Sequence, residues 1–375
     1  MIYKKKKLKL FFIKMGIQSQ KMPKIEIQKN LIINPVKSKF YKNHKIIVFK
    51  SIDDILYLIY HINYNETVIY NLSTNQIMSR IDIEDGGKDF RHIFDDYNKR
   101  DLLLVIMEIN IYIFNIRNMK CINKFKIELN IRRIGSFIKD NNHINVVVFN
   151  NTNNLIDIFN LNGKKEKSLI KEGKGDIIDF EVYYDKNFKK SYIIITGIFV
   201  IYNRKDYVIS FDNDKNQIYR KYNTDDEVNN IVISDIHDKI KMICSIYNYI
   251  LIFDFHSSNM IKKIFFNGQN GICLWSNDFL IAGNTSIFED RRHTFYQQDI
   301  DKRIEGKIHQ IYLIDLDGNE IKRINEDIEG DEKYKDAIID KKVLSIIKIN
   351  HPKYKNCLIY KDYDNIIKMI IIDDK

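Results

Sequence analysis

A short apolar run that ends in Asn or Asp and leads straight into a turn occurs six times along this chain of 375 residues. In five copies a large or branched residue flanked by an apolar one precedes the polar residue, and in the sixth the flanking residue is serine. The six copies are Ile69-Tyr70-Asn71, Ile113-Phe114-Asn115, Ile158-Phe159-Asn160, Ser210-Phe211-Asp212, Ile252-Phe253-Asp254 and Leu313-Ile314-Asp315. A degenerate seventh copy is Met369-Ile370-Ile371. Their middle residues lie 42 to 61 positions apart, and such a period is typical of propeller blades or of long helical repeats.

The residues around each copy favour strands over helices. Runs rich in Ile, Val, Tyr and Phe precede the copies at 56–60, 102–107, 146–149, 192–195, 240–246, 279–282 and 357–360. Such β-branched and aromatic runs are of strand length. Turn-forming residues follow, for example Ser73-Thr74-Asn75 and Asn162-Gly163, and then a further strand at 76–81, 121–126, 261–265 or 321–324. Each unit therefore reads as a four-stranded antiparallel meander whose third strand carries the repeated signature.

Seven such units begin near residues 44, 89, 131, 176, 227, 270 and 337. The last unit ends after its third strand at 366–372, which would leave an open sheet edge. The segment 24–34 can supply the missing strand from the other end of the chain. The sequence thus predicts an all-β fold: one domain over residues 24–375, built as a seven-bladed propeller of four-stranded antiparallel blades and closed by an N-terminal strand. Residues 1–23 are expected to form a basic, flexible tail outside the ring.

This pattern resembles a divergent WD40-repeat β-propeller, in which the third strand of each blade ends in an aromatic residue followed by Asp. The aromatic residue is Tyr or Phe in five copies, and Asn replaces Asp in three. The stretch 343–354 leading into Cys357-Leu358-Ile359 is similar to the closing repeat of many WD40 proteins from AT-rich protists, and 271–280 fits the preceding blade. The resemblance covers residues 24–375 and implies a non-catalytic scaffold for binding other proteins, without cofactors.

The chain also departs from that family. It contains no Gly-His dipeptide, and no copy has a literal Trp-Asp. The Asp-His-Ser/Thr-Trp hydrogen-bond network that stiffens typical WD40 blades is therefore mostly missing. We expect apolar packing between adjacent sheets to stabilise the ring instead.

The positive charge is concentrated at the N-terminus. Eight of the ten net positive charges lie before residue 25, and no acidic residue precedes Glu26. The nearly neutral remainder argues against a nucleic-acid-binding face. The candidate contacts to an anionic surface are Lys4, Lys5, Lys6, Lys7 and Lys9. The tail fits a solvated extension, a nuclear-import or anionic-membrane patch, or a mitochondrial presequence without arginine; its apolar stretch is too short for a membrane-spanning helix.

No local motif predicts chemistry. Gly173-Lys174-Gly175 lacks the third glycine of a phosphate loop and reads as a connection between blades. Asp212, Asp214 and Asn216 imitate calcium ligands, but the glycine and glutamate that such a loop requires are replaced, so a hairpin turn is expected. We therefore expect no catalytic, cofactor-binding or metal-binding residues, no cofactor and no small-molecule substrate. A glycosidase-like propeller stays open as an alternative, because its acids would come from separate blades.

The arginine pair in Ile131-Arg132-Arg133-Ile134-Gly135 resembles the Phe/Leu-Arg-Arg-Gly motif of phosphoinositide-binding propellers, with an extra Ile134 and a displaced position. Exposed arginines between two blades are the preferred interpretation. The cysteines Cys121, Cys244, Cys273 and Cys357 lie in four different blades without metal-ligand spacing. Buried, reduced thiols are expected, in a cytoplasmic or nuclear protein.

The longest insertion spans residues 284–309. It contains Arg291, Arg292, His293, Phe295 and Tyr296, which are the candidate partner-binding residues, together with the neighbouring segment 326–342. Binding residues often lie on long loops of a rigid scaffold, although AT-rich genomes also produce such insertions as plain expansions. The expected function is a protein-interaction scaffold with partners of unknown identity. The alternative is a propeller that contacts phosphoinositides or an anionic membrane through its lysine-rich N-terminus.

Overall fold

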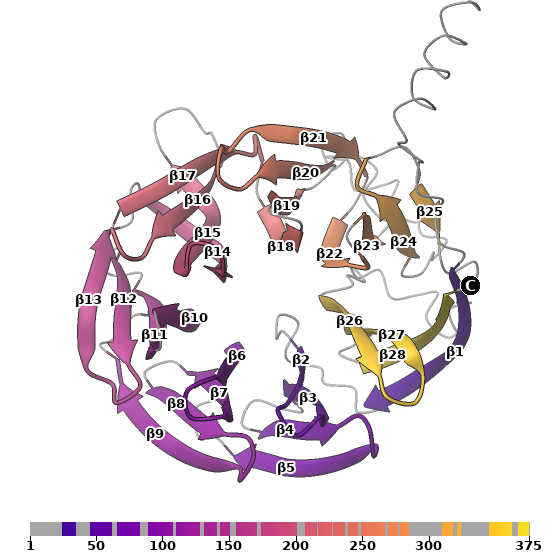
Figure 1. The fold of residues 1–375 in the computed structure, drawn as a ribbon, viewed down its shortest axis with the longest axis horizontal. Helices are drawn as coiled ribbons and strands as arrows, with labels where there is room; N and C mark the ends of the chain where they lie inside the picture. The colour runs from indigo at the N-terminus through magenta and orange to yellow at the C-terminus, as the bar shows by residue number, and fades with distance from the viewer. Residues whose placement is uncertain are drawn as a thin grey trace, which may run out of the picture.

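In the residues that it describes, a computed structural model places 28 strands in seven separate four-stranded antiparallel sheets, arranged as blades around a ring (Figure 1). The structure describes residues 25–34, 46–61, 66–82, 89–107, 110–127, 131–140, 143–150, 155–170, 174–200, 207–215, 217–226, 228–236, 239–246, 249–266, 269–276, 278–284, 310–317, 321–323, 345–361 and 367–374. In this part of the chain no helix has the length and apolar character needed to cross a membrane. The predicted all-β, seven-bladed fold is confirmed.

Each blade is numbered by its order along the chain. Blade 1 contains β2 (Ile47–Lys50), β3 (Leu56–His61), β4 (Glu66–Asn71) and β5 (Gln76–Asp82). Blade 2 contains β6 (Asp89–Asp95), β7 (Arg100–Ile106), β8 (Asn110–Asn115) and β9 (Lys120–Lys126). Blade 3 contains β10 (Ile131–Asp140), β11 (His143–Asn150), β12 (Leu155–Asn160) and β13 (Lys165–Ile170). Blade 4 contains β14 (Lys174–Asp185), β15 (Lys190–Val200), β16 (Tyr207–Asp212) and β17 (Gln217–Asn223).

The remaining blades complete the ring. Blade 5 contains β18 (Val228–Ile236), β19 (Lys239–Ile246), β20 (Tyr249–Asp254) and β21 (Met260–Phe265). Blade 6 contains β22 (Gln269–Leu274), β23 (Phe279–Asn284), β24 (Gln310–Asp315) and β25 (Ile321–Arg323). Blade 7 contains β26 (Ser345–His351), β27 (Lys355–Lys361) and β28 (Ile367–Asp374), and its fourth strand is β1 (Ile25–Asn34). The first strand of each blade lines the centre of the ring (Figure 1).

The ring closes inside blade 7. Strand β1 pairs with β28 in antiparallel fashion, from Ile25 opposite Asp374 to Asn34 opposite Ile367. The indigo β1 therefore lies beside the yellow β28 in Figure 1. This pairing covers the edge that β28 would otherwise expose, as the sequence predicted.

Apolar side chains hold adjacent blades together. Within the described part of the chain the buried residues form seven clusters, and each cluster joins two neighbouring blades. Strand β7 shows the reason: Leu102 and Leu104 face blade 3, whereas Leu103 faces blade 1, because successive side chains of a strand point to opposite faces of the sheet. Full burial of one such side chain contributes about 1.5–3 kcal/mol. The expectation that packing between sheets stabilises the ring is confirmed.

The aromatic position of the repeated signature is part of this packing. In five blades a register shift between the third and fourth strands falls directly before it, at Tyr70, Phe114, Phe159, Phe211 and Phe253. A bulge of this kind adds a residue and increases the local twist. Four of these side chains are buried, and Tyr70 is half-buried. The repeat in the sequence therefore marks a repeated β-bulge.

Hydrogen bonds between blades add to the packing. The residue after the signature Asn or Asp offers its carbonyl oxygen to a side chain of the preceding blade at four junctions. The four bonds run from a side-chain donor to a carbonyl oxygen: Asn123 Nδ2 to Leu161 (2.6 Å), Lys167 Nζ to Asn213 (2.5 Å), Tyr222 Oη to Phe255 (2.6 Å) and His351 Nε2 to Leu72 (3.0 Å). The donors differ in type while the acceptor is always backbone. The sequence therefore gives no repeated motif for this set of bonds, and sequence reasoning missed it.

Candidate partner-binding face

The turns after the first and third strands of each blade lie on one side of the ring, which we call the turn face. These two strands run in the same direction because each sheet is an antiparallel meander. Contacts between blades confirm the grouping: the backbone N–H of Ile52 donates to Asp101 Oδ2 at 2.9 Å, and Asp185 Oδ2 lies 3.3 Å from His256 Nε2. The turn face is therefore a continuous surface that runs across several blades.

The polar residue of the signature shapes these turns. Asn71 Oδ1 accepts the backbone N–H of Ser73 at 2.8 Å and of Thr74 at 3.1 Å. In the same way, backbone N–H groups of the following turn donate to Oδ1 of Asn115, Asn160, Asp212, Asp254 and Asp315. Such bonds from a side chain to the following backbone reverse the chain locally. The signature Asn or Asp is thus a turn-forming residue, which explains why the two residue types interchange.

Many of the same turns end in a residue with the left-handed backbone conformation. Positive φ angles occur in third-strand turns at Asn75 (58°), Met119 (54°), Gly163 (81°) and Ser258 (61°). They occur in first-strand turns at Asp54 (61°), Lys99 (49°), Lys189 (52°) and Lys355 (58°). Residues other than glycine adopt this conformation only at a cost, so the surrounding hydrogen bonds must hold the turns in place. The turn face consequently presents its side chains from a rigid backbone.

Three large apolar side chains are exposed at these turn tips. Ile52 is 42% exposed, Tyr97 78% and Phe188 61%. They come from the β2–β3, β6–β7 and β14–β15 turns, so they share one face of the ring. Exposed apolar side chains on a rigid scaffold can anchor a partner, because contact removes their surface from water.

Phe188 lies above a polar and aromatic network between blades 4 and 5. Its ring meets the His256 ring edge-on, with the centroids 5.3 Å apart. His256 Nε2 lies 3.3 Å from the fully buried Asp185, and His256 Nδ1 lies 2.9 Å from the hydroxyl of Tyr219. Burial, followed by the nearby Tyr219 and the Asp212 charge, raises the pKa of Tyr192 beneath this network. Tyr192 therefore stays neutral, with its ring centroid 6.4 Å from that of His256.

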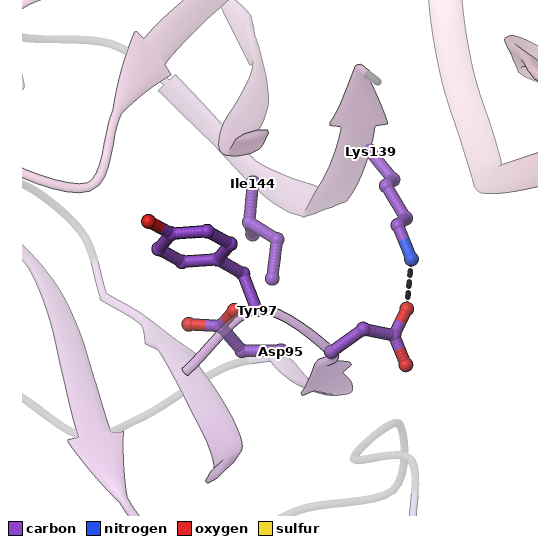
Figure 2. Close-up of a pocket in the computed structure, with 5 residues that line it drawn as sticks. Asp95, Tyr97, Lys139 and Ile144 are labelled. Atoms are coloured by element: carbon purple, nitrogen blue, oxygen red, sulfur yellow. Dashed lines mark hydrogen bonds and ion pairs between the residues drawn. The ribbon is translucent and has the colours of Figure 1, made fainter. Parts of the chain in front are cut away.

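A small cavity of about 180 Å³ lies between blades 2 and 3 on the same face (Figure 2). Its lining residues are Asp95, Asp96, Tyr97, Lys139 and Ile144. Figure 2 shows the Tyr97 ring near Ile144, with the ion pair between Lys139 and Asp96 at the opposite side. Asp95 is buried and accepts hydrogen bonds from Asn98 and Arg100. Both carboxylates at this cavity therefore already have protein partners.

The residues that the sequence suggested for binding lie outside the described part of the chain. This holds for Arg291, Arg292, His293, Phe295 and Tyr296, and also for Lys4, Lys5, Lys6, Lys7 and Lys9. The described strands do fix where the two long segments attach. Segment 285–309 joins β23 to β24, and segment 324–344 joins β25 to β26. The ends of β23 and β25 and the starts of β24 and β26 lie on the side opposite the turn face.

The sequence motifs that resemble chemical sites lie in a hairpin turn and in the first strands of two blades. Asp212 Oδ1 accepts the backbone N–H groups of Asp214 and Lys215 at 3.0 and 3.1 Å, so this stretch is a hairpin turn, as expected. Lys174 and Gly175 open strand β14, and Arg132 and Arg133 lie within strand β10, so the expectation that both motifs lie in connections between blades is wrong. The β-pairing of the long inner strands begins earlier than the residue types suggest. Among the described residues, no group of three His, Cys, Asp or Glu side chains is placed to hold a metal ion.

The cysteines agree with the expectation at three positions. Cys244 and Cys357 are buried and Cys273 is half-buried, whereas Cys121 is exposed on the outer strand β9. The expectation of burial is wrong for Cys121, because the outermost strand of a blade packs on one face only.

The ring and its turn face define the chain as a seven-bladed β-propeller. No family model and no curated protein sequence matches it significantly. Among solved structures, the chain is similar to a crystal structure of BBS1N in complex with ARL6DN, soaked with mercury. The TM-score is 0.60 at 10% sequence identity, over 93% of this chain and 97% of that chain. The same complex soaked with lead gives 0.60 at 11% identity, over 92% and 96%. At such identity the similarity concerns the fold alone.

Proposed function

We propose that the chain is a non-catalytic protein-interaction scaffold of the WD40-repeat type. The observation that carries this proposal is the exposure of Ile52, Tyr97 and Phe188 on rigid turns of one face. A propeller presents such turns around a ring without a dedicated reaction centre. BBS1N, which has a similar fold, was crystallised in complex with ARL6DN, and this supports a protein as the partner.

Two surfaces of the scaffold are available for partners. The turn face presents the apolar tips, while the candidate residues Arg291, Arg292, His293, Phe295 and Tyr296 belong to the segment attached at the opposite face. We assign the turn face as the primary surface, because its side chains are held in place. The cytoplasm is the proposed compartment, with the nucleus as the second, and a fluorescent fusion observed in the native cell tests both.

The test is affinity purification of the tagged full-length chain from its native cell, followed by mass spectrometry. We expect at least one protein in near-stoichiometric amount, and we expect the triple variant Ile52→Ser/Tyr97→Ser/Phe188→Ser to lose it. A matched control changes equally exposed residues of the outer strands, Ile77→Ser/Met78→Ser/Phe265→Ser, and should retain it. A wild-type chain that retains no protein above the level of an untagged sample would contradict the scaffold function. Loss only on deletion of 286–308 would move the primary surface to the opposite face.

A further inference from the structure

We propose that the surface around Phe188 binds an acidic protein segment that contributes one large apolar side chain. We call this surface the Phe188 patch; it consists of Lys186, Phe188 and Lys189 in the β14–β15 turn and Lys215 in the β16–β17 turn. The proposal rests on the proposed scaffold function and specifies its partner. Three observations carry it: the aromatic tip is rigid, the charge around the tip is positive, and the charge on blades 1 and 2 of the same face is balanced.

The tip is fixed before any partner arrives. Asp185 Oδ1 accepts the backbone N–H of Asn187 at 2.9 Å and of Phe188 at 3.1 Å. Lys189 follows in the left-handed conformation, and His256 supports the ring of Phe188 from blade 5. A preorganised aromatic side chain loses little conformational entropy when it is covered, so its exposed surface contributes to affinity. An apolar side chain of the partner is the chemistry that fits it.

The charge around the tip determines which charged residues the partner segment should carry. Lys186, Lys189 and Lys215 are exposed. The carboxylates of the same two turns are largely occupied: Asp185 is fully buried beside His256, and Asp212 lies buried at 3.5 Å from Lys190.

Asp214 is the one exposed acid that the structure describes in these two turns, and its carboxylate lies 3.7 Å from Lys190. The patch is therefore positive, and it complements an acidic segment.

The remainder of the turn face favours a protein segment over a membrane. Blades 1 and 2 present balanced charge on the same face, because the exposed carboxylates of Asp53, Asp54 and Asp96 form ion pairs with Arg117, Lys50 and Lys139. An anionic bilayer lying flat on this face would meet these neutral ion pairs as well as the patch lysines, and only the lysines would attract it. A short peptide covers the patch without reaching the ion pairs.

The experiment selects random dodecapeptides, displayed on phage, against the immobilised full-length chain. We expect the enriched peptides to be rich in Asp and Glu around one large apolar residue. Synthetic copies of them should bind at least tenfold more weakly to Phe188→Ser and to Lys186→Glu/Lys189→Glu/Lys215→Glu. Binding should also weaken as salt rises, since the charges are exposed. Phe265→Ser is the matched control, because Phe265 is 64% exposed on the outer strand β21, and it should bind as wild type does.

Three results would overturn the proposal: no enrichment of any peptide, enrichment without acidic residues, or equal binding by the Phe188→Ser variant. Sedimentation with phosphatidylserine vesicles that Phe188→Ser abolishes would also overturn it, in favour of a lipid surface. The scaffold function fails separately. If the wild-type chain retains native partners and the patch variants retain all of them, the scaffold stands and the patch does not; a wild-type chain without partners removes the scaffold itself.

Discussion

The imidazole Nε2 of His351 lies 3.0 Å from the carbonyl oxygen of Leu72, although 279 positions separate the two residues in sequence. The other ring nitrogen, Nδ1, accepts the backbone N–H groups of Lys353 at 3.1 Å and of Tyr354 at 3.3 Å. Because Nδ1 is an acceptor, the proton is on Nε2, which donates to Leu72. One side chain thus shapes the first turn of blade 7 and fastens that blade to blade 1.

His351→Ala should lower the free energy of unfolding by about 2–4 kcal/mol, because it leaves several buried backbone groups without partners. His351→Asn should cost less, since an Asn side chain can still accept the turn N–H groups. Urea unfolding followed by the fluorescence of Trp275, the single tryptophan, measures the change. His143 is exposed, and His143→Ala should fall within about 0.5 kcal/mol of wild type. Equal stability of the two alanine variants would contradict the role of His351.

Asp95 should make stability depend on pH. Burial alone would raise the pKa of its carboxyl, but hydrogen bonds from Asn98 and Arg100 and the Arg100 charge outweigh burial and hold the pKa below its ordinary value of 3.8. A lowered pKa contributes stability that is present above 3.8 and is lost as the pH falls through the folded value. Asp95→Asn should therefore be less stable than wild type at pH 6, and the difference should shrink below pH 3.8.

Urea unfolding at a series of pH values between about 6 and 3 tests this prediction. Asp278→Asn is the control, because Asp278 is exposed in the corresponding turn of blade 6. If Asp278→Asn changes the pH dependence as much as Asp95→Asn does, the hydrogen bonds around Asp95 are not its cause.

The four cysteines should differ sharply in reactivity. Burial raises the pKa of Cys357 to about 11, that of Cys273 to about 12 and that of Cys244 further. Cys121 is exposed on β9, and the thiolate is the reactive form. A thiol-disulfide reagent at pH 8 should modify one thiol rapidly in the native protein and all four in denaturant. Cys121→Ser should remove the rapid phase, and a rapid phase that survives this change would place the reactive thiol elsewhere.

Gly163 should tolerate no side chain. Its φ angle is 81°, and a Cβ atom there would lie 2.5 Å from Cγ of Phe125 in the preceding blade. Gly163→Ala should cost about 1–3 kcal/mol of unfolding free energy, from backbone strain and the displaced ring. Thermal unfolding measures it. Asn162→Ala in the same turn is the control, because it keeps the backbone hydrogen bonds. Similar melting temperatures for both variants would show that Phe125 moves aside freely.

The N-terminal lysines give the membrane alternative its own test. If that alternative holds, the full-length chain sediments with phosphatidylserine vesicles at low salt, because each lysine near such a surface contributes about 1 kcal/mol. Deletion of residues 1–23 should then abolish sedimentation and leave protein partners unchanged. A full-length variant with Lys4, Lys5, Lys6, Lys7 and Lys9 changed to Gln separates charge from length. Full-length protein that remains in the supernatant excludes the alternative.

The architecture could be predicted because it repeats. The bulge before Phe114 recurs in five blades and the turn shaped by Asn115 in six, so several weak signals reinforce one another. The bonds between blades could not be predicted, because their donors are as different as Asn123, Lys167 and His351 and share only a backbone acceptor. The type of a residue shows whether its side chain can accept a hydrogen bond. Every residue has a main-chain carbonyl, so its type does not show whether that carbonyl accepts one.

The candidate site was missed for a related reason. Phe188 and Tyr97 look like ordinary apolar residues of a strand-rich sequence, and their exposure follows from the positions of turns on the assembled ring. The length of the insertion after Asn284 favours that segment instead. One signal was available: each aromatic residue lies between an Asp and a Lys in a short turn, where a buried position is rarely found.

The pairing of Ile25 with Asp374 places both ends of the described chain at the same end of one sheet. Opposed forces on these two ends would therefore break the backbone hydrogen bonds between β1 and β28 one pair at a time, starting at Ile25 and Asp374. They would not load all of these hydrogen bonds together in shear. Blade 7 is thus the mechanically weak element of the ring.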